Sequence, residues 1–198
     1  MIDSYFRNSY QRFIIDPLLR LRQIHLLSPL KATTLGLLFG MTIPILLFFK
    51  LSYWAALFLL ASGFFDTLDG SLARHKNAAS PRGAAFDIVA DRVVEWAILL
   101  GLYLFDPAGR GNVTLFMLGS VYVCITTFLV VGIFHNNTSE KSFHYSPGLI
   151  ERSEAFFFFF LMILIPSLFT PLALLFGSLT FLTAFIRMKQ FFRNHQTG

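Results

Sequence analysis

Four aspartates stand close together in this sequence, in two pairs with helical spacing. Asp66 and Asp69 are three residues apart, and Asp87 and Asp91 are four apart. On a helix either spacing places both side chains on one face, with Cβ atoms about 5–6 Å apart. Two such helices facing each other would bring four carboxylates to one point, where their repulsion requires a compensating cation. Because carboxylate oxygens favour hard ions, we expect two Mg²⁺ or Mn²⁺ ions here, an arrangement that serves in-line phosphoryl transfer.

The residues between these aspartates could border a ligand. Gly70, Ala73 and Gly83 are small enough for a ligand to lie against the backbone. Arg74 supplies a planar donor suited to a phosphate group. The alternative is that the carboxylates are structural partners of neighbouring arginines, or that they line an ion pathway. Four carboxylates at this spacing favour a functional site, because each is costly at membrane depth.

The stretch from Asp66 to Asp91 resembles the signature of the CDP-alcohol phosphotransferase family of integral membrane enzymes. That signature is D-x2-D-G-x2-A-R, then eight or nine residues, then G-x3-D-x3-D. Its eight fixed positions are all filled in this chain, with a spacer of eight, by Asp66, Asp69, Gly70, Ala73, Arg74, Gly83, Asp87 and Asp91.

The resemblance implies a role for each of these residues. Asp66, Asp69 and Asp87 would be metal ligands, and Asp91 would be both a ligand and the general base. The CDP group would be bordered by the remaining four, Gly70, Ala73, Arg74 and Gly83. The implied reaction transfers a phosphatidyl group from CDP-diacylglycerol to a small polar alcohol and releases CMP, within a homodimer.

Two other functions stay open at this point. Within the same family, the donor could be CDP-choline or CDP-ethanolamine and the acceptor diacylglycerol, although the short chain favours CDP-diacylglycerol as the donor. In a different functional class, the acidic cluster could be the ion path of a cation transporter. Metal-dependent flux without nucleotide turnover would favour the transporter.

The composition indicates a membrane protein. Hydrophobic residues make up 55% of the 198 residues and charged residues only 14%, against about 25% in ordinary soluble domains. The net charge of +5 does not indicate a nucleic-acid partner, because the basic residues flank apolar runs, where anionic lipid is the simpler partner. Cys124 is the single cysteine, so the chain cannot form an internal disulfide.

The apolar residues form runs of about the ~20 residues needed to cross a bilayer. We predict an all-α, polytopic protein with six transmembrane helices, at about residues 32–49, 52–73, 84–105, 113–134, 149–168 and 170–188. Residues 1–30 mix arginines with apolar residues at helical spacing, which predicts an interfacial amphipathic helix. The whole chain, 1–198, is expected to be one membrane domain, with residues 31–190 forming the six-helix bundle.

The distribution of basic residues predicts the orientation. Of the 16 lysines and arginines, 13 flank the same side of the predicted spans, only Lys50 and Arg110 flank the other, and Arg92 lies inside a span. By the positive-inside rule both termini are cytoplasmic, in agreement with an even number of spans. The four aspartates then lie at the cytoplasmic side, in what we expect to be a bacterial inner membrane.

The acceptor is expected to contact the polar segment that precedes the fifth span. Lys141, His144 and Arg152 are the candidate acceptor-binding residues. Family members that use a phosphorylated polyol resemble this chain in having an arginine at the start of that helix, and some carry a second arginine one turn later. Glu154 and Ala155 stand in that region here. The acceptor is therefore left open between a polar alcohol and an alcohol phosphate.

Overall fold

The structure, a computed structural model, describes residues 16–19, 24, 27–134, 149–150 and 152–194. Within these ranges every regular element is helical, which confirms the all-α prediction. The elements are α2 (Asp16–Leu19), α4 (Pro29–Phe48), α5 (Ser52–His75), α6 (Pro81–Phe105), α7 (Pro107–Phe134), α8 (Arg152–Leu164), the 3₁₀ turn η2 (Pro166–Leu168) and α9 (Phe169–Asn194).

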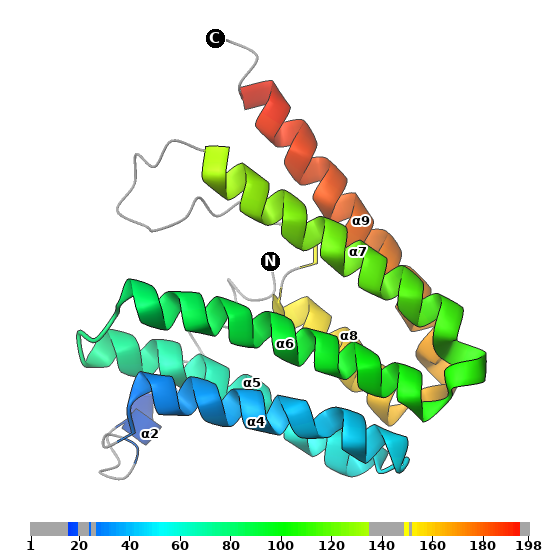
Figure 1. Ribbon diagram of the computed structural model, residues 1–198, viewed down its shortest axis with the longest axis horizontal. Coiled ribbons are helices and arrows are strands. Elements are labelled where there is room, and N and C mark those ends of the chain that lie inside the picture. Colours follow the sequence, from blue (N-terminus) through cyan, green and yellow to red (C-terminus); the bar gives the residue numbers. More distant parts are fainter. Residues whose placement is uncertain (1–15, 20–23, 25–26, 135–148, 151, 195–198) are drawn as a thin grey trace.

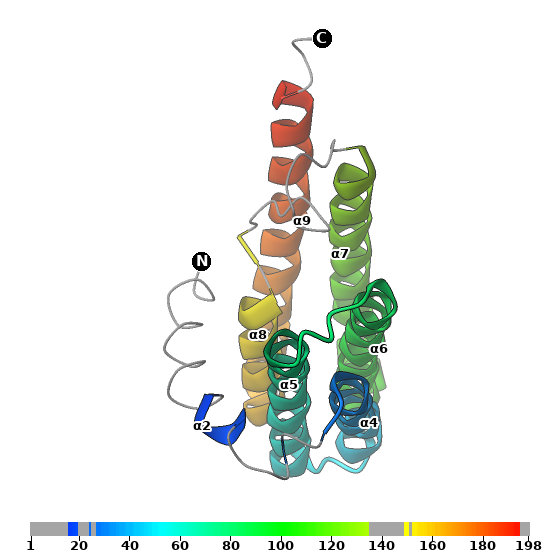
Figure 2. The same cartoon turned by 90° about the vertical axis from the view of Figure 1, so that its left-hand side faces the viewer.

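The helices form two arms that meet at one end (Figure 1). In one arm α4 packs against both α5 and α6, and α8 lies against α5. The other arm is the antiparallel pair α7 and α9. The short connections from α6 to α7 and from α8 to α9 lie at the closed end, and the arms diverge away from it (Figures 1 and 2).

Small residues let α4 approach its two neighbours closely. The Ser62 hydroxyl on α5 donates a buried hydrogen bond to the Gly36 carbonyl on α4, at 2.8 Å. A Cβ atom added to Gly40 would lie only 2.6 Å from a methyl group of Val94 on α6. Small residues at helix interfaces are typical of membrane bundles, where close backbone packing replaces the hydrophobic effect as the source of association.

A buried arginine holds the closed end together. Arg110 is only 6% exposed, and its guanidinium donates to the carbonyls of Leu102 and Pro166, at 3.4 and 3.1 Å. The same group lies 4.3 Å from the ring centroids of both Phe105 and Phe169. One side chain therefore joins α6, η2 and α9 at the point where the two arms meet.

The chain is an integral membrane protein with at least four helices suited to crossing a bilayer. Among the described residues, four helical stretches are long and apolar enough, namely Pro29–Phe48, Ser52–His75, Pro107–Phe134 and Pro166–Arg193. Helix α6 has sufficient length but carries several charges, and the 13 residues of α8 span only about 20 Å. The count of six spans stays a prediction, as does the amphipathic helix, most of which lies outside the described residues.

The helices lie where the apolar runs predict them, but three of them differ most in their bounds. Helix α8 covers only Arg152–Leu164 of the expected 149–168. Helix α9 ends at Asn194 rather than near residue 188, and α7 starts early. We expected this span to begin near residue 113, but the helix begins at Pro107. Its first turn is capped by Asp106, whose side chain accepts a hydrogen bond from the Gly109 amide at 3.2 Å. The polar residues of this turn are helical because the Asp106 cap and the buried Arg110 stabilise them.

Candidate functional site

The hairpin formed by α5 and α6 brings the two aspartate pairs to the same end of the bundle. Asp66 and Asp69 lie in the last three turns of α5, and Asp87 and Asp91 lie in the second and third turns of α6. Helix α6 begins where it does because the Ser80 side chain caps it, accepting a hydrogen bond from the Gly83 amide at 3.1 Å.

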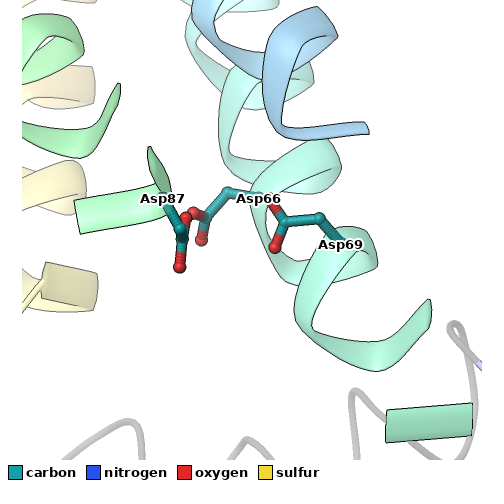
Figure 3. Close-up of side chains that lie close together, drawn as sticks. All are labelled: Asp66, Asp69 and Asp87. Carbon is teal, nitrogen blue, oxygen red and sulfur yellow. The ribbon is translucent and has the colours of Figure 1, made fainter. Parts of the chain in front are cut away.

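Three of the four carboxylates converge. Asp66, Asp69 and Asp87 each offer an oxygen, and these three atoms lie within 4.8 Å of one another. Figure 3 shows the Asp66 and Asp69 side chains on α5 pointing toward Asp87 on α6. Asp69 is 5% exposed, and its Oδ2 has no hydrogen-bond partner among the described residues; the same holds for Oδ1 of Asp87.

This donor set fits a divalent cation. Three carboxylates held this closely repel one another, and buried carboxylate oxygens without partners are costly unless a cation or a donor satisfies them. The ligand atoms are all carboxylate oxygens, which suits Mg²⁺ or Mn²⁺ better than a metal that prefers sulfur or imidazole. Of the four carboxylates that were expected to converge, Asp66, Asp69 and Asp87 therefore do so in the structure.

The fourth carboxylate, Asp91, is held by an arginine from a third helix. Arg152 is the first residue of α8, and its Nη1 lies 2.5 Å from Asp91 Oδ2. Its Nη2 lies 2.7 Å from Asp66 Oδ1, so one guanidinium bridges the two helices. We expected Arg152 to contact the acceptor, and it does lie at the edge of the acidic cluster; its ion pairs with the aspartates were not anticipated.

The expected CDP-binding positions surround the same end of the hairpin. Gly70 and Ala73 are half-buried on α5 and Gly83 is half-buried on α6, whereas Arg74 is exposed. An added Cβ at Gly70 would meet only the tip of the Arg74 side chain, at 3.5 Å. Arg74 itself donates to the Ser71 hydroxyl at 3.1 Å. No neighbouring helix of the described residues therefore covers the backbone at Gly70.

A cavity of about 420 Å³ lies between the two arms and reaches the acidic cluster. Asp91 and Arg152 line it at the cluster, and its other walls come from α6, α7, α8 and α9. Most of the lining is apolar, including Phe128 and Phe176. Arg92 and Glu95 also line this cavity, and they form an ion pair in which Arg92 Nη1 lies 2.6 Å from Glu95 Oε2. The charges of these two residues therefore compensate each other.

Arg187 is a functional candidate whose place in the sequence indicated only the orientation of the chain. It lines the cavity from α9 and is 8% exposed, and its Nη1 donates to the Cys124 carbonyl at 2.9 Å. Among the described residues its Nε has no hydrogen-bond partner, and no carboxylate forms a salt bridge with its guanidinium. An ionisable residue near the end of an apolar run is the sequence signal that could have identified it. Lys141 and His144, the other acceptor candidates, lie outside the described residues.

Comparison with known proteins agrees with this geometry. The sequence model of CDP-alcohol phosphatidyltransferases matches residues 26–190, which is most of the chain and includes the whole acidic cluster. The chain belongs to the CDP-alcohol phosphatidyltransferase family. All four aspartates and the cavity therefore lie within the part of the chain that defines this family.

Among individual proteins, the chain is similar to two with the following names and identities. The inner membrane protein YnjF of Escherichia coli is 31% identical over 144 residues, which is 69% of each chain. A phosphatidylinositol phosphate synthase of Mycobacteroides abscessus is 28% identical over 102 residues, or 52% of this chain and 46% of that protein. The match thus spans less than half of that synthase. None of the solved structures matches the chain significantly.

Proposed function

We propose that this protein transfers the phosphatidyl group of CDP-diacylglycerol to a small polar alcohol and releases CMP, in phospholipid biosynthesis. The observation that carries the proposal is the convergence of Asp66, Asp69 and Asp87, two of whose buried carboxylate oxygens have no hydrogen-bond partner among the described residues. Asp91 stands beside them and lines an apolar cavity, where a lipid and a polar substrate could meet.

Asp66, Asp69, Asp87 and Asp91 would hold two divalent ions, Mg²⁺ or Mn²⁺. Bound there, such ions supply charge neutralisation for the pyrophosphate and for the departing CMP. The small positions Gly70, Ala73 and Gly83 would let the nucleotide approach the two helices, and Arg74 would donate to a phosphate oxygen.

Asp91 is the proposed general base. The acceptor hydroxyl gives its proton to the Asp91 carboxylate while its oxygen forms a bond to the phosphorus that carries the diacylglycerol. The bond from that phosphorus to the bridging oxygen breaks, and this oxygen leaves with CMP. No covalent enzyme intermediate is required, because donor phosphorus and acceptor oxygen meet directly in one pocket.

We propose an acceptor that carries a negative charge, bound in the cavity by Arg187. In the cavity Arg92 is paired with Glu95 and Arg152 with aspartates, whereas Arg187 has no carboxylate partner among the described residues. A charge-assisted hydrogen bond to a phosphate would satisfy it. The similar Mycobacteroides protein is named a phosphatidylinositol phosphate synthase, a name that agrees with a phosphorylated acceptor.

The orientation and assembly are also proposals. The basic residues support cytoplasmic termini and a cytoplasmic active site. In that orientation a water-soluble acceptor would reach the cluster from the cytoplasm and the lipid donor from the inner leaflet. A homodimer is proposed as the assembly, to be tested by cross-linking in native membranes.

The function is tested with the purified protein, CDP-diacylglycerol and Mg²⁺ or Mn²⁺. A panel of alcohols and alcohol phosphates is supplied, CMP release is measured, and the lipid product is identified by mass spectrometry. Acceptor-dependent CMP release that is lost in Asp69→Asn and Asp91→Asn is the expected result. Unchanged release in both variants would refute the assigned roles, and metal flux in proteoliposomes without CMP release would support a cation transporter.

A further inference from the structure

The guanidinium of Arg152 divides the four carboxylates into two unequal sets. Asp66, Asp69 and Asp87 form the open set, with oxygens within 4.8 Å of one another. Asp91 and one oxygen of Asp66 form the second set. Arg152 lies between them, with its Nη1 2.5 Å from Asp91 Oδ2 and its Nη2 2.7 Å from Asp66 Oδ1. Asp66 belongs to both sets, so the two are adjacent.

The two sets differ in how their charges are satisfied. In the open set, Asp69 is 95% buried and its Oδ2 has no partner among the described residues, so this set can take up a cation. Between Asp66 and Asp91 a cation is already present, because the planar guanidinium donates to both carboxylates from one fixed fork. A divalent ion bound by Asp66 and Asp91 would need the same oxygens.

We propose that Arg152 takes the place of the second divalent ion in the resting protein. This chain then binds one ion at Asp66, Asp69 and Asp87, and it accepts another only when Arg152 leaves Asp91. The inference rests on the proposed function, and it specifies the order in which the two divalent ions bind. Arg152 is therefore a positioning residue: it holds the carboxylates of Asp66 and Asp91 and so controls when they can bind the second ion.

The cavity offers space for the Arg152 side chain once it has left Asp91. Arg152 lines the cavity and is about one-third exposed, so its side chain borders open space as well as the aspartates. An anionic substrate group arriving there would compete with Asp91 for the guanidinium and would free the Asp91 carboxylate. Binding of the anion and of the second ion would then strengthen each other, because coupling between two sites is reciprocal.

The test counts bound Mn²⁺ in the purified full-length protein, without any nucleotide, by electron paramagnetic resonance and calorimetric titration. We expect one tightly bound ion in the wild type. In Arg152→Gln we expect a second bound Mn²⁺ ion, whose affinity is at least about tenfold higher than that of any second ion in the wild type. The two ions in this variant should also show spin coupling. Arg152→Lys should remain close to the wild type in stoichiometry, because a cation is retained.

The matched control is Arg187→Gln, which removes the same charge from the same cavity without touching the aspartates. Its Mn²⁺ stoichiometry should equal that of the wild type. Two ions of comparable affinity in the wild type would overturn the proposal without recourse to any variant, and so would a single ion in a folded Arg152→Gln protein. Absence of Mn²⁺ binding from all proteins would overturn it too, whereas the proposed function is judged separately, by CMP release.

Discussion

Arg152 and Asp91 are 61 residues apart in the chain, yet their side chains form one of the shortest ion pairs of the described structure, at 2.5 Å. The pair joins the start of α8 to the third turn of α6, and the same guanidinium reaches Asp66 on α5.

Asp69→Asn should reduce CMP release by about 100-fold or more, because a buried ligand oxygen is replaced by an amide. The variant should still fold. Without metal, removing one of three crowded carboxylates relieves repulsion, so the melting temperature in a chelator should equal or exceed that of the wild type. Full activity, or a large loss of stability in the chelator, would contradict this role.

Added Mn²⁺ should stabilise the wild type but not Asp69→Asn. A ligand that binds only the folded state at 100 times its dissociation constant contributes about 2.7 kcal/mol to stability. The measurement is thermal unfolding in detergent with and without Mn²⁺, and Ca²⁺ serves to test the preference for smaller ions. Equal stabilisation of both proteins would place the ion elsewhere.

Arg187→Gln should raise the KM for an anionic acceptor about tenfold or more and leave the KM for CDP-diacylglycerol nearly unchanged. The reason is that the substitution removes the cation of the cavity that has no carboxylate partner among the described residues. A neutral alcohol supplied as acceptor is the control, since its KM should not change. An identical KM for the anionic acceptor in variant and wild type would rule out this contact.

Arg110→Met should destabilise the protein by about 2–4 kcal/mol. The variant leaves the carbonyls of Leu102 and Pro166 without their donor and removes the cation between two phenylalanine rings. Lys50→Gln is the control at the same end, because exposed Lys50 only approaches Phe105, at 5.9 Å. The comparison is made by thermal unfolding, and equal effects of the two substitutions would contradict the role of Arg110.

Gly40→Ala should destabilise the packing of α4 against α6, because the added Cβ would lie 2.6 Å from Val94. Val94→Ala in the same chain should restore part of the loss, which a double-mutant cycle measures. At Gly119 on α7 an added Cβ meets nothing within 4 Å, so Gly119→Ala should be neutral or stabilising by up to about 1 kcal/mol. Additive effects of the Gly40 and Val94 substitutions would contradict direct contact.

The sequence predicted the helices and the convergence of four aspartates, of which Asp66, Asp69 and Asp87 converge, because both follow from local patterns. Apolar runs of bilayer length determine the helices, and a spacing of three or four residues determines which side chains share a face. It predicted the start of α7 poorly, since a buried Arg110 near a helix start resembles a loop residue until its aromatic neighbours are known.

The contacts of Arg152 and Arg187 could not be predicted from the sequence for a different reason. Each depends on residues more than 60 positions away, on helices whose rotation and separation no local spacing fixes. The sequence placed Arg152 correctly at a helix start but gave no measure of its distance from Asp91. It placed Arg187 at the end of an apolar run, and only the divergence of the two arms makes that position a cavity wall.

The bridge from Arg152 to two earlier helices has a consequence for biosynthesis. During translation α5 and α6 enter the membrane with their aspartates well before α8 emerges from the ribosome. Until then this nascent half holds closely spaced negative groups without their arginine. Correct insertion of the first half therefore requires temporary partners for these groups, such as water, cations or the insertion machinery, and arrival of α8 later supplies Arg152 to Asp66 and Asp91.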